Sequence, residues 1–204
     1  PGGTPGDGAI IVAQKMHDAL VHGHASAYVY WQMNAGNFEE TTHTLLGAGN
    51  LSNPHESKKY DAFKHFSRYV RPGAQRVAAT FLNGTASIGG SNEYDTHSAL
   101  NVSAYIHDED GTLTYVFVNM EGTTQNVMLG MPGDETVEMF EVFRTPETEN
   151  FVQLSDIVVG GDQVELTIPA YSLVTLYGQL GEPPIPGDAN RDGIVSDADY
   201  TVWA

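Results

Sequence analysis

Oxygen-bearing side chains recur at short, fixed intervals near the end of the chain. Between residues 188 and 199 they occupy positions 1, 3, 5, 9 and 12 of a twelve-residue loop, and Gly193 occupies position 6. Calcium prefers six to eight oxygen ligands, and this spacing is that of an EF-hand-type loop, in which position 7 contributes a backbone carbonyl. The sequence therefore predicts a calcium site formed by Asp188, Asn190, Asp192, Ile194, Ser196 and Asp199.

Three histidines near the start of the chain form a second group of potential metal ligands. His17 and His22 are five residues apart, and His24 follows Gly23. On a helix, this spacing places the first two side chains about 140° apart, so they would not share a face. We therefore expect these histidines to be capping or packing groups rather than a metal site. The sequence shows no Ser-His-Asp arrangement, phosphate-binding loop or dinucleotide-binding fingerprint.

The charge balance of the 204-residue chain is strongly acidic. It has 9 basic and 26 acidic side chains, which give a formal net charge of −17. Phosphate-rich partners require clustered Lys and Arg, so we expect neither a nucleic-acid nor a membrane partner. The absence of cysteine excludes disulfides and thiol chemistry. Since the chain starts at Pro1 and stops abruptly after Ala204, we expect it to be a piece of a longer protein.

The first third of the chain has the pattern of an α/β structure. Apolar residues recur every three or four positions up to His22, which predicts a helix that Gly23 ends in the left-handed conformation. An aromatic and β-branched run then indicates a buried strand. The expected elements are a helix over 9–22, a strand over 27–31, a long loop over 34–57 and a helix over 57–71 that Pro72 and Gly73 end.

After about residue 75 the pattern changes to that of an all-β structure. Residues 100–106 alternate between apolar and polar, and residues 112–120 can pair with them across a turn in which Gly111 supplies a positive φ. Short strands at this spacing predict an antiparallel β-sandwich. Further strands are expected at 76–82, 124–129, 136–143, 151–158, 163–168 and 172–178.

The final segment, GDANRDGIVSDADYTVW, resembles the first calcium-binding repeat of type I dockerins, in which an aspartate such as Asp199 takes the last loop position. This resemblance implies a cohesin-type partner protein and a secreted polysaccharide-degrading system. The final segment follows a proline-rich stretch, GQLGEPPIPG, that we interpret as a linker.

Two other stretches resemble glycoside hydrolase family 30, a group that includes endo-xylanases. They are AQKMHDALVHGHASAYVYW, ending at Trp31, and KYDAFKHFSRYVRPG, ending at Gly73. The ending IPAYSLVTLY resembles the last strand of that family's side β-sandwich. The resemblance implies the last α/β units of a (β/α)8 barrel, followed by that sandwich.

The resemblance also implies where the site lies. The strand over 28–31 would be the eighth barrel strand, so that Tyr30 and Trp31 would contact the polysaccharide substrate. The family uses two carboxylates in a retaining mechanism, and both would precede Pro1. The adjacent Glu39 and Glu40 cannot replace them because their side chains diverge. No catalytic residue is therefore expected in this chain, which should be inactive alone.

Together these patterns predict an α+β chain in four parts and two alternative functions. The leading hypothesis is the C-terminal part of a secreted retaining glycoside hydrolase that acts on a β-linked glycan of the xylan type. The alternative is a non-catalytic carbohydrate-binding or scaffolding sandwich tethered by a dockerin. The expected parts are a barrel remnant over 1–74, a β-sandwich over 75–178, a linker over 179–187 and a truncated dockerin repeat over 188–204.

Overall fold

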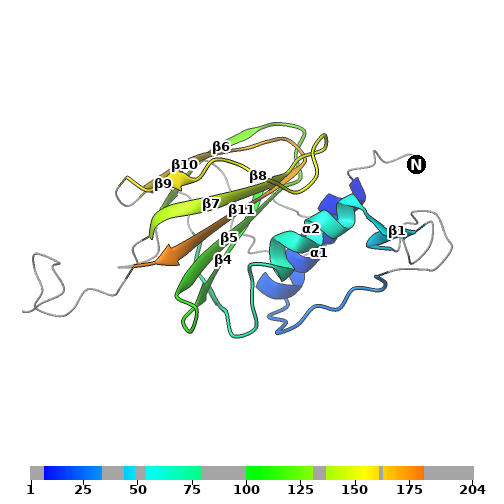
Figure 1. The fold of residues 1–204 in the computed structure, drawn as a ribbon, viewed down its shortest axis with the longest axis horizontal. Coiled ribbons are helices and arrows are strands. Elements are labelled where there is room, and N and C mark those ends of the chain that lie inside the picture. The colour runs from blue at the N-terminus through cyan, green and yellow to red at the C-terminus, as the bar shows by residue number, and fades with distance from the viewer. Residues whose placement is uncertain are drawn as a thin grey trace, which may run out of the picture.

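A computed structural model describes residues 7–33, 44–48, 54–79, 100–130, 137–160 and 163–181 (Figure 1). The calcium loop predicted over 188–199 and the linker before it lie outside these residues. The described elements are α1 (Asp7–Val21), β1 (Leu46–Ala48), β2 (Pro54–Glu56), α2 (Lys58–Ser67), β3 (Gln75–Val77), β4 (Leu100–His107), β5 (Thr112–Asn119), β6 (Gln125–Gly130), β7 (Val137–Thr145), β8 (Val152–Gln153), β9 (Ile157–Val158), β10 (Gln163–Ile168) and β11 (Ser172–Leu180).

Two antiparallel sheets form the predicted β-sandwich. The larger sheet has the strand order β3-β4-β5-β11-β7-β8, with β9 also paired to β7, and the smaller one pairs β10 with β6. The hairpin between β4 and β5 turns through Gly111, whose φ of 60° is the positive value expected from the sequence. The antiparallel class and most of the strands of this region thus agree with the prediction from the sequence.

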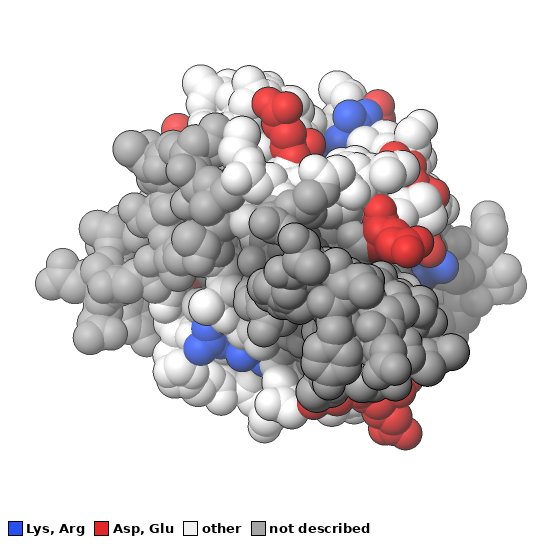
Figure 2. All heavy atoms as spheres, turned by 90° about the vertical axis from the view of Figure 1, so that its left-hand side faces the viewer, with Lys and Arg blue, Asp and Glu red and all other residues white. Residues whose placement is uncertain are grey.

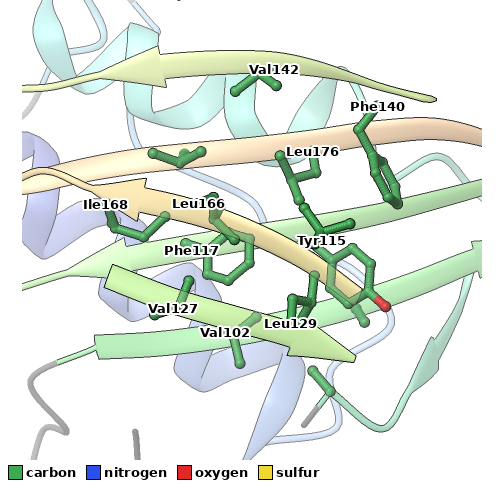
Figure 3. Packing of buried hydrophobic residues seen from close by; sticks show 14 of the residues in the cluster. Val102, Tyr115, Phe117, Val127, Leu129, Phe140, Val142, Leu166, Ile168 and Leu176 are labelled. Atoms are coloured by element: carbon green, nitrogen blue, oxygen red, sulfur yellow. The ribbon is translucent and has the colours of Figure 1, made fainter. Parts of the chain in front are cut away.

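The central strand β5 is buried on both faces. Leu113, Tyr115 and Phe117 point into the core between the two sheets, whereas Val116 and Val118 point to the opposite face. Because side chains alternate along a strand, a run that is apolar at every position must be covered on both sides. Figure 3 shows the inter-sheet core, where side chains of the smaller sheet meet those of the larger one.

The two helices cover the other face of the larger sheet (Figure 1). Ala13 and Met16 of α1 belong to the same buried cluster as Phe66 of α2 and Leu173 of β11. The three-and-four spacing of the apolar residues in α1 accounts for this, since it places them on one face. The helices and the sheet therefore share a hydrophobic core, and the boundary expected at residue 74 stays a prediction.

The start of α2 is fixed by side-chain hydrogen bonds. The Ser57 hydroxyl accepts from the Tyr60 amide and donates to the Leu45 carbonyl at 2.5 Å. Lys58 then donates to the carbonyl oxygens of Pro146 and Glu149, beyond the end of β7. These contacts tie the N-terminus of α2 to both the β1–β2 region and the sheet.

Three sequence-based expectations about local structure differ from the described structure. Residues 27–31 form no strand with the described residues, none of which pairs with them, and their assignment to the eighth barrel strand stays a prediction. The expected loop over 34–57 contains the antiparallel pair β1–β2. The positive φ after α1 belongs to His24, at 47°, and not to Gly23.

The described surface carries mainly acidic charge. On the face shown in Figure 2, Asp and Glu side chains are spread over several places, and the Lys and Arg side chains do not gather into a basic patch. Within the described part of the chain, no helix is long and apolar enough to cross a membrane.

Candidate functional site

The segment that contains the two predicted substrate-binding residues, 28–33, alternates between two environments. Tyr28 and Tyr30 are half-buried, and their rings lie 6.4 and 6.3 Å from the ring of Phe63 on α2. In contrast, Val29 is 92% exposed, Trp31 80% and Met33 54%. This period of two is that of an extended strand with one face on a helix and the other face open.

The alternation separates the two residues that were predicted to contact substrate. Tyr30 packs against α2, and burial together with the neighbouring Tyr28 raises the pKa of its phenol. Trp31 lies on the opposite, open side. The site role of Trp31 stays a prediction, and Tyr30 has a packing contact that accounts for its position.

The end of this segment is tied to the small β1–β2 sheet. The Leu45 amide donates to the Gln32 carbonyl at 3.1 Å, and the Leu46 amide donates to the Met33 carbonyl at 2.8 Å. The backbone that carries Trp31 is therefore fixed by two sets of contacts. One is the packing of Tyr30 on α2, and the other is the hydrogen bond from Leu46 of β1. Such a fixed, exposed aromatic ring can pack against the apolar C–H face of a sugar.

A second candidate site is a pocket of about 480 Å³ between the end of α2 and the larger sheet. Its floor is a stack of aromatic rings: the Tyr69 centroid lies 4.7 Å from that of Phe143, which lies 5.4 Å from that of Phe151. Tyr177 also lines the pocket, and the polar lining residues are Arg68, Glu141 and Gln153.

The Tyr69 hydroxyl is a polar group without a partner in this otherwise aromatic floor. It is buried and has no hydrogen-bond partner among the described residues. Burial raises the pKa of the phenol to about 12. No local sequence pattern predicts this pocket, because its residues come from the segment directly after α2, from β7 and β11, and from the β8 region.

The structure brings together two histidines that the sequence analysis placed apart. Ligand atoms of His17, Asp18 and His22 all lie within 4.8 Å of one another. His22 directly follows α1, which ends at Val21, and its ring lies edge-on to that of His17 with 5.9 Å between the centroids. The interpretation of the histidines as capping or packing groups stays a prediction.

The fold of the described residues is shared with endoxylanases of glycoside hydrolase family 30. The similar solved structures include the family 30 endoxylanase of Clostridium papyrosolvens C71, with a TM-score of 0.65, 22% identity and coverage of 86% of this chain and 39% of that one. The family 30 subfamily 8 xylanase Xyn30A of Clostridium acetobutylicum has a TM-score of 0.67 and 23% identity. The match covers 88% of this chain and 40% of that one. At these identities the similarity establishes the fold alone.

Sequence comparison finds similarity to glucuronoxylanases. The chain is 27% identical over 167 residues to the glucuronoxylanase XynC of Bacillus subtilis strain 168. The aligned region covers 82% of this chain. It spans about a third of the length of the curated relatives that it matches. A scan against protein-family models gives no match. The resemblance to family 30 inferred from the motifs is supported, and the dockerin resemblance stays a prediction.

Proposed function

We propose that this chain is the C-terminal part of a secreted retaining glycoside hydrolase that cleaves xylan. The observation that carries the proposal is the coverage: the similarity extends over more than four-fifths of this chain but about two-fifths or less of each relative. The remainder of such a protein is where we expect the barrel and both catalytic carboxylates. In a retaining mechanism these groups stand about 5 Å apart, one as nucleophile and one as general acid and base.

The open strip of Val29, Trp31 and Met33 supports this proposal. A monomeric protein rarely exposes several large apolar side chains in one row unless another surface covers them. In a (β/α)8 barrel, one face of each strand packs on the helices and the other faces the barrel interior. We propose that Tyr28 and Tyr30 lie on the helix side of the eighth strand and that Trp31 faces the substrate cleft.

This role of Trp31 can be tested in the protein encoded by the complete gene. Trp31→Ala should raise the KM for glucuronoxylan roughly tenfold, the effect of losing about 1.4 kcal/mol of ring contact, with a smaller effect on kcat. Val158→Ala is the matched control, because Val158 is also exposed but lies on β9 of the sandwich. An unchanged KM in Trp31→Ala would contradict the assignment.

A carbohydrate-binding role of the sandwich is the second candidate function, and the pocket below α2 favours it. Its aromatic floor and polar rim combine ring faces with hydrogen-bonding groups, as a small-molecule site requires. Xylo-oligosaccharide binding to this chain by calorimetry tests the idea. Gln153→Ala should weaken binding, whereas Gln125→Ala on β6 should not. If the unmodified chain gives no heat of binding, the carbohydrate-binding role is excluded.

The C-terminal segment completes the proposal. We propose that Asp188, Asn190, Asp192, Ile194, Ser196 and Asp199 bind calcium and that the dockerin to which they would belong attaches the enzyme to a cohesin. The support is the loop spacing in the sequence, since these residues lie outside the described part of the chain. Export from the cell belongs to the same proposal and rests on the same resemblance.

A further inference from the structure

We propose that His17, Asp18 and His22 form a binding site for a divalent transition-metal ion of the zinc class at the C-terminal end of α1. One ligand atom of each residue lies within 4.8 Å of the other two. Ligands of a tetrahedral zinc ion, at 2.0–2.2 Å from the metal, stand about 3.5 Å from one another. The proposal requires the half-buried Asp18 and the exposed His22 to move toward His17 when the ion binds.

His17 provides the buried ligand of the site. Its side chain is 1% exposed, and Nδ1 has no hydrogen-bond partner among the described residues. An unpartnered buried ring nitrogen is uncommon in folded proteins, and a bound ion is one of the explanations for it.

Asp18 is held in place by a chain of hydrogen bonds that reaches the sheet. The Gln14 amide donates to Asp18 Oδ1 at 2.7 Å, and the Asn101 amide on β4 donates to Gln14 Oε1 at 2.8 Å. Outer contacts of this kind orient metal ligands and are part of a metal site. The Gln14 contact engages only Oδ1 of Asp18, and we propose that its other carboxylate oxygen binds the ion.

His22 is the third ligand and directly follows the end of α1. Its amide still donates to the Asp18 carbonyl at 2.9 Å, but the residue follows the last helical position, Val21. Its ring lies edge-on to that of His17, with 5.9 Å between the centroids. The two rings thus lie close enough at the end of α1 for both to contact one ion.

The donor set selects the class of ion. Two imidazole nitrogens and one carboxylate oxygen suit zinc and its neighbours, whereas calcium prefers oxygen ligands throughout. A water molecule would complete the tetrahedron on the exposed side. Because the ion would link a residue of the buried helix face to one beyond the helix, we infer a structural role that fixes the end of α1 and the chain leading to Tyr28.

The test uses the complete chain without an affinity tag, in calcium-containing buffer so that the acidic loop over 188–199 does not compete for the probe. Zinc binding is measured by calorimetry, and Co²⁺ is added to record the visible absorption of a tetrahedral site. We expect one ion per chain, and binding about tenfold or more weaker in His22→Asn and Asp18→Asn. His24→Asn is the matched control, because His24 is exposed, is close in sequence and lies outside the cluster.

Each outcome decides the question. His22 is exposed, so His22→Asn should keep the fold, which circular dichroism verifies before titration. Loss of binding in His22→Asn with retention in His24→Asn supports the site. Binding weaker than about 1 mM in the unmodified chain, equal binding in His22→Asn, or equal loss in His24→Asn overturns it.

Discussion

The imidazole of His65 on α2 lies 2.8 Å, Nδ1 to Oγ1, from the hydroxyl of Thr175 on β11, a residue 110 positions later in the chain. Its other ring nitrogen lies 2.9 Å from the Thr145 hydroxyl on β7. The ring is fully buried, so one side chain of the helix satisfies two neighbouring strands. This contact positions α2, and through Phe63 it positions the segment that carries Trp31.

Replacement of His65 should therefore loosen the helix layer from the sheet. His65→Ala leaves two buried threonine hydroxyls without their partner and creates a cavity, which should lower the free energy of unfolding by about 2–4 kcal/mol. Urea denaturation followed by circular dichroism measures this change. His24→Asn should change stability by less than about 0.5 kcal/mol. Equal stability of the His65→Ala and unmodified chains would show that the hydrogen bonds do not hold the layers together.

Two buried histidines should make the chain sensitive to acid. Burial lowers the pKa of His17 to about 4 and that of His65 to about 3, from 6.5 for the unfolded chain. Below pH 6.5 the unfolded state binds more protons than the folded state, so stability falls as the pH falls. Between pH 7 and pH 5 the two residues together should remove on the order of 3 kcal/mol.

Denaturation at several pH values, with a chelator present to keep metal from His17, measures this slope. In His65→Gln the slope between pH 7 and pH 5 should be about half that of the unmodified chain. A slope that is unchanged by this substitution would mean that His65 is not the neutral, buried group described above.

Gly178 on β11 faces side chains that leave no room for a methyl group. An added Cβ would lie 2.5 Å from Val137 Cγ1 and 2.8 Å from two ring carbons of the buried Phe140. Gly178→Ala should therefore destabilise the chain by about 1–3 kcal/mol. Gly160→Ala is the control, since a Cβ there meets nothing within 4 Å. Thermal unfolding of both variants compares them, and a Gly178→Ala chain as stable as Gly160→Ala would contradict the packing at β11.

Calcium should order the C-terminal segment if the loop prediction is correct. Trp203 follows the loop closely, so its fluorescence should change on calcium titration of a chain that also carries the second dockerin repeat. Asp192→Ala should abolish the change, and Asp156→Ala, in the sandwich, should leave it intact. A titration without any fluorescence response would count against the dockerin resemblance.

Local patterns predicted the elements whose partners lie close in sequence. The β4–β5 hairpin was predicted because its alternation and its Gly111 turn are both visible within 20 residues. Residues 27–31 were predicted as a strand from composition, but a barrel strand also needs two parallel neighbours. The described residues provide none, and only the alternation of Tyr30 and Trp31 retains the strand-like pattern.

The candidate sites depended more strongly on three-dimensional structure. The spacing of His17 and His22 did not indicate that their ligand atoms lie within 4.8 Å of each other, because an angular separation along a helix ignores the reach of the side chains. The aromatic pocket had no local signal, since Tyr69 and Phe143 meet only when α2 packs on β7. Trp31 was identified through a family resemblance, and its exposed position agrees with that expectation without testing it.

The most direct test of the proposed function compares two proteins in one assay, the release of reducing sugar from glucuronoxylan. One is the 204-residue chain, and the other is the product of the complete gene, including whatever precedes Pro1. The account predicts hydrolysis by the complete product, lost on replacement of either of two strand-end carboxylates encoded before Pro1, and none by the 204-residue chain. Hydrolysis by the 204-residue chain at a rate comparable to that of the complete product would contradict it.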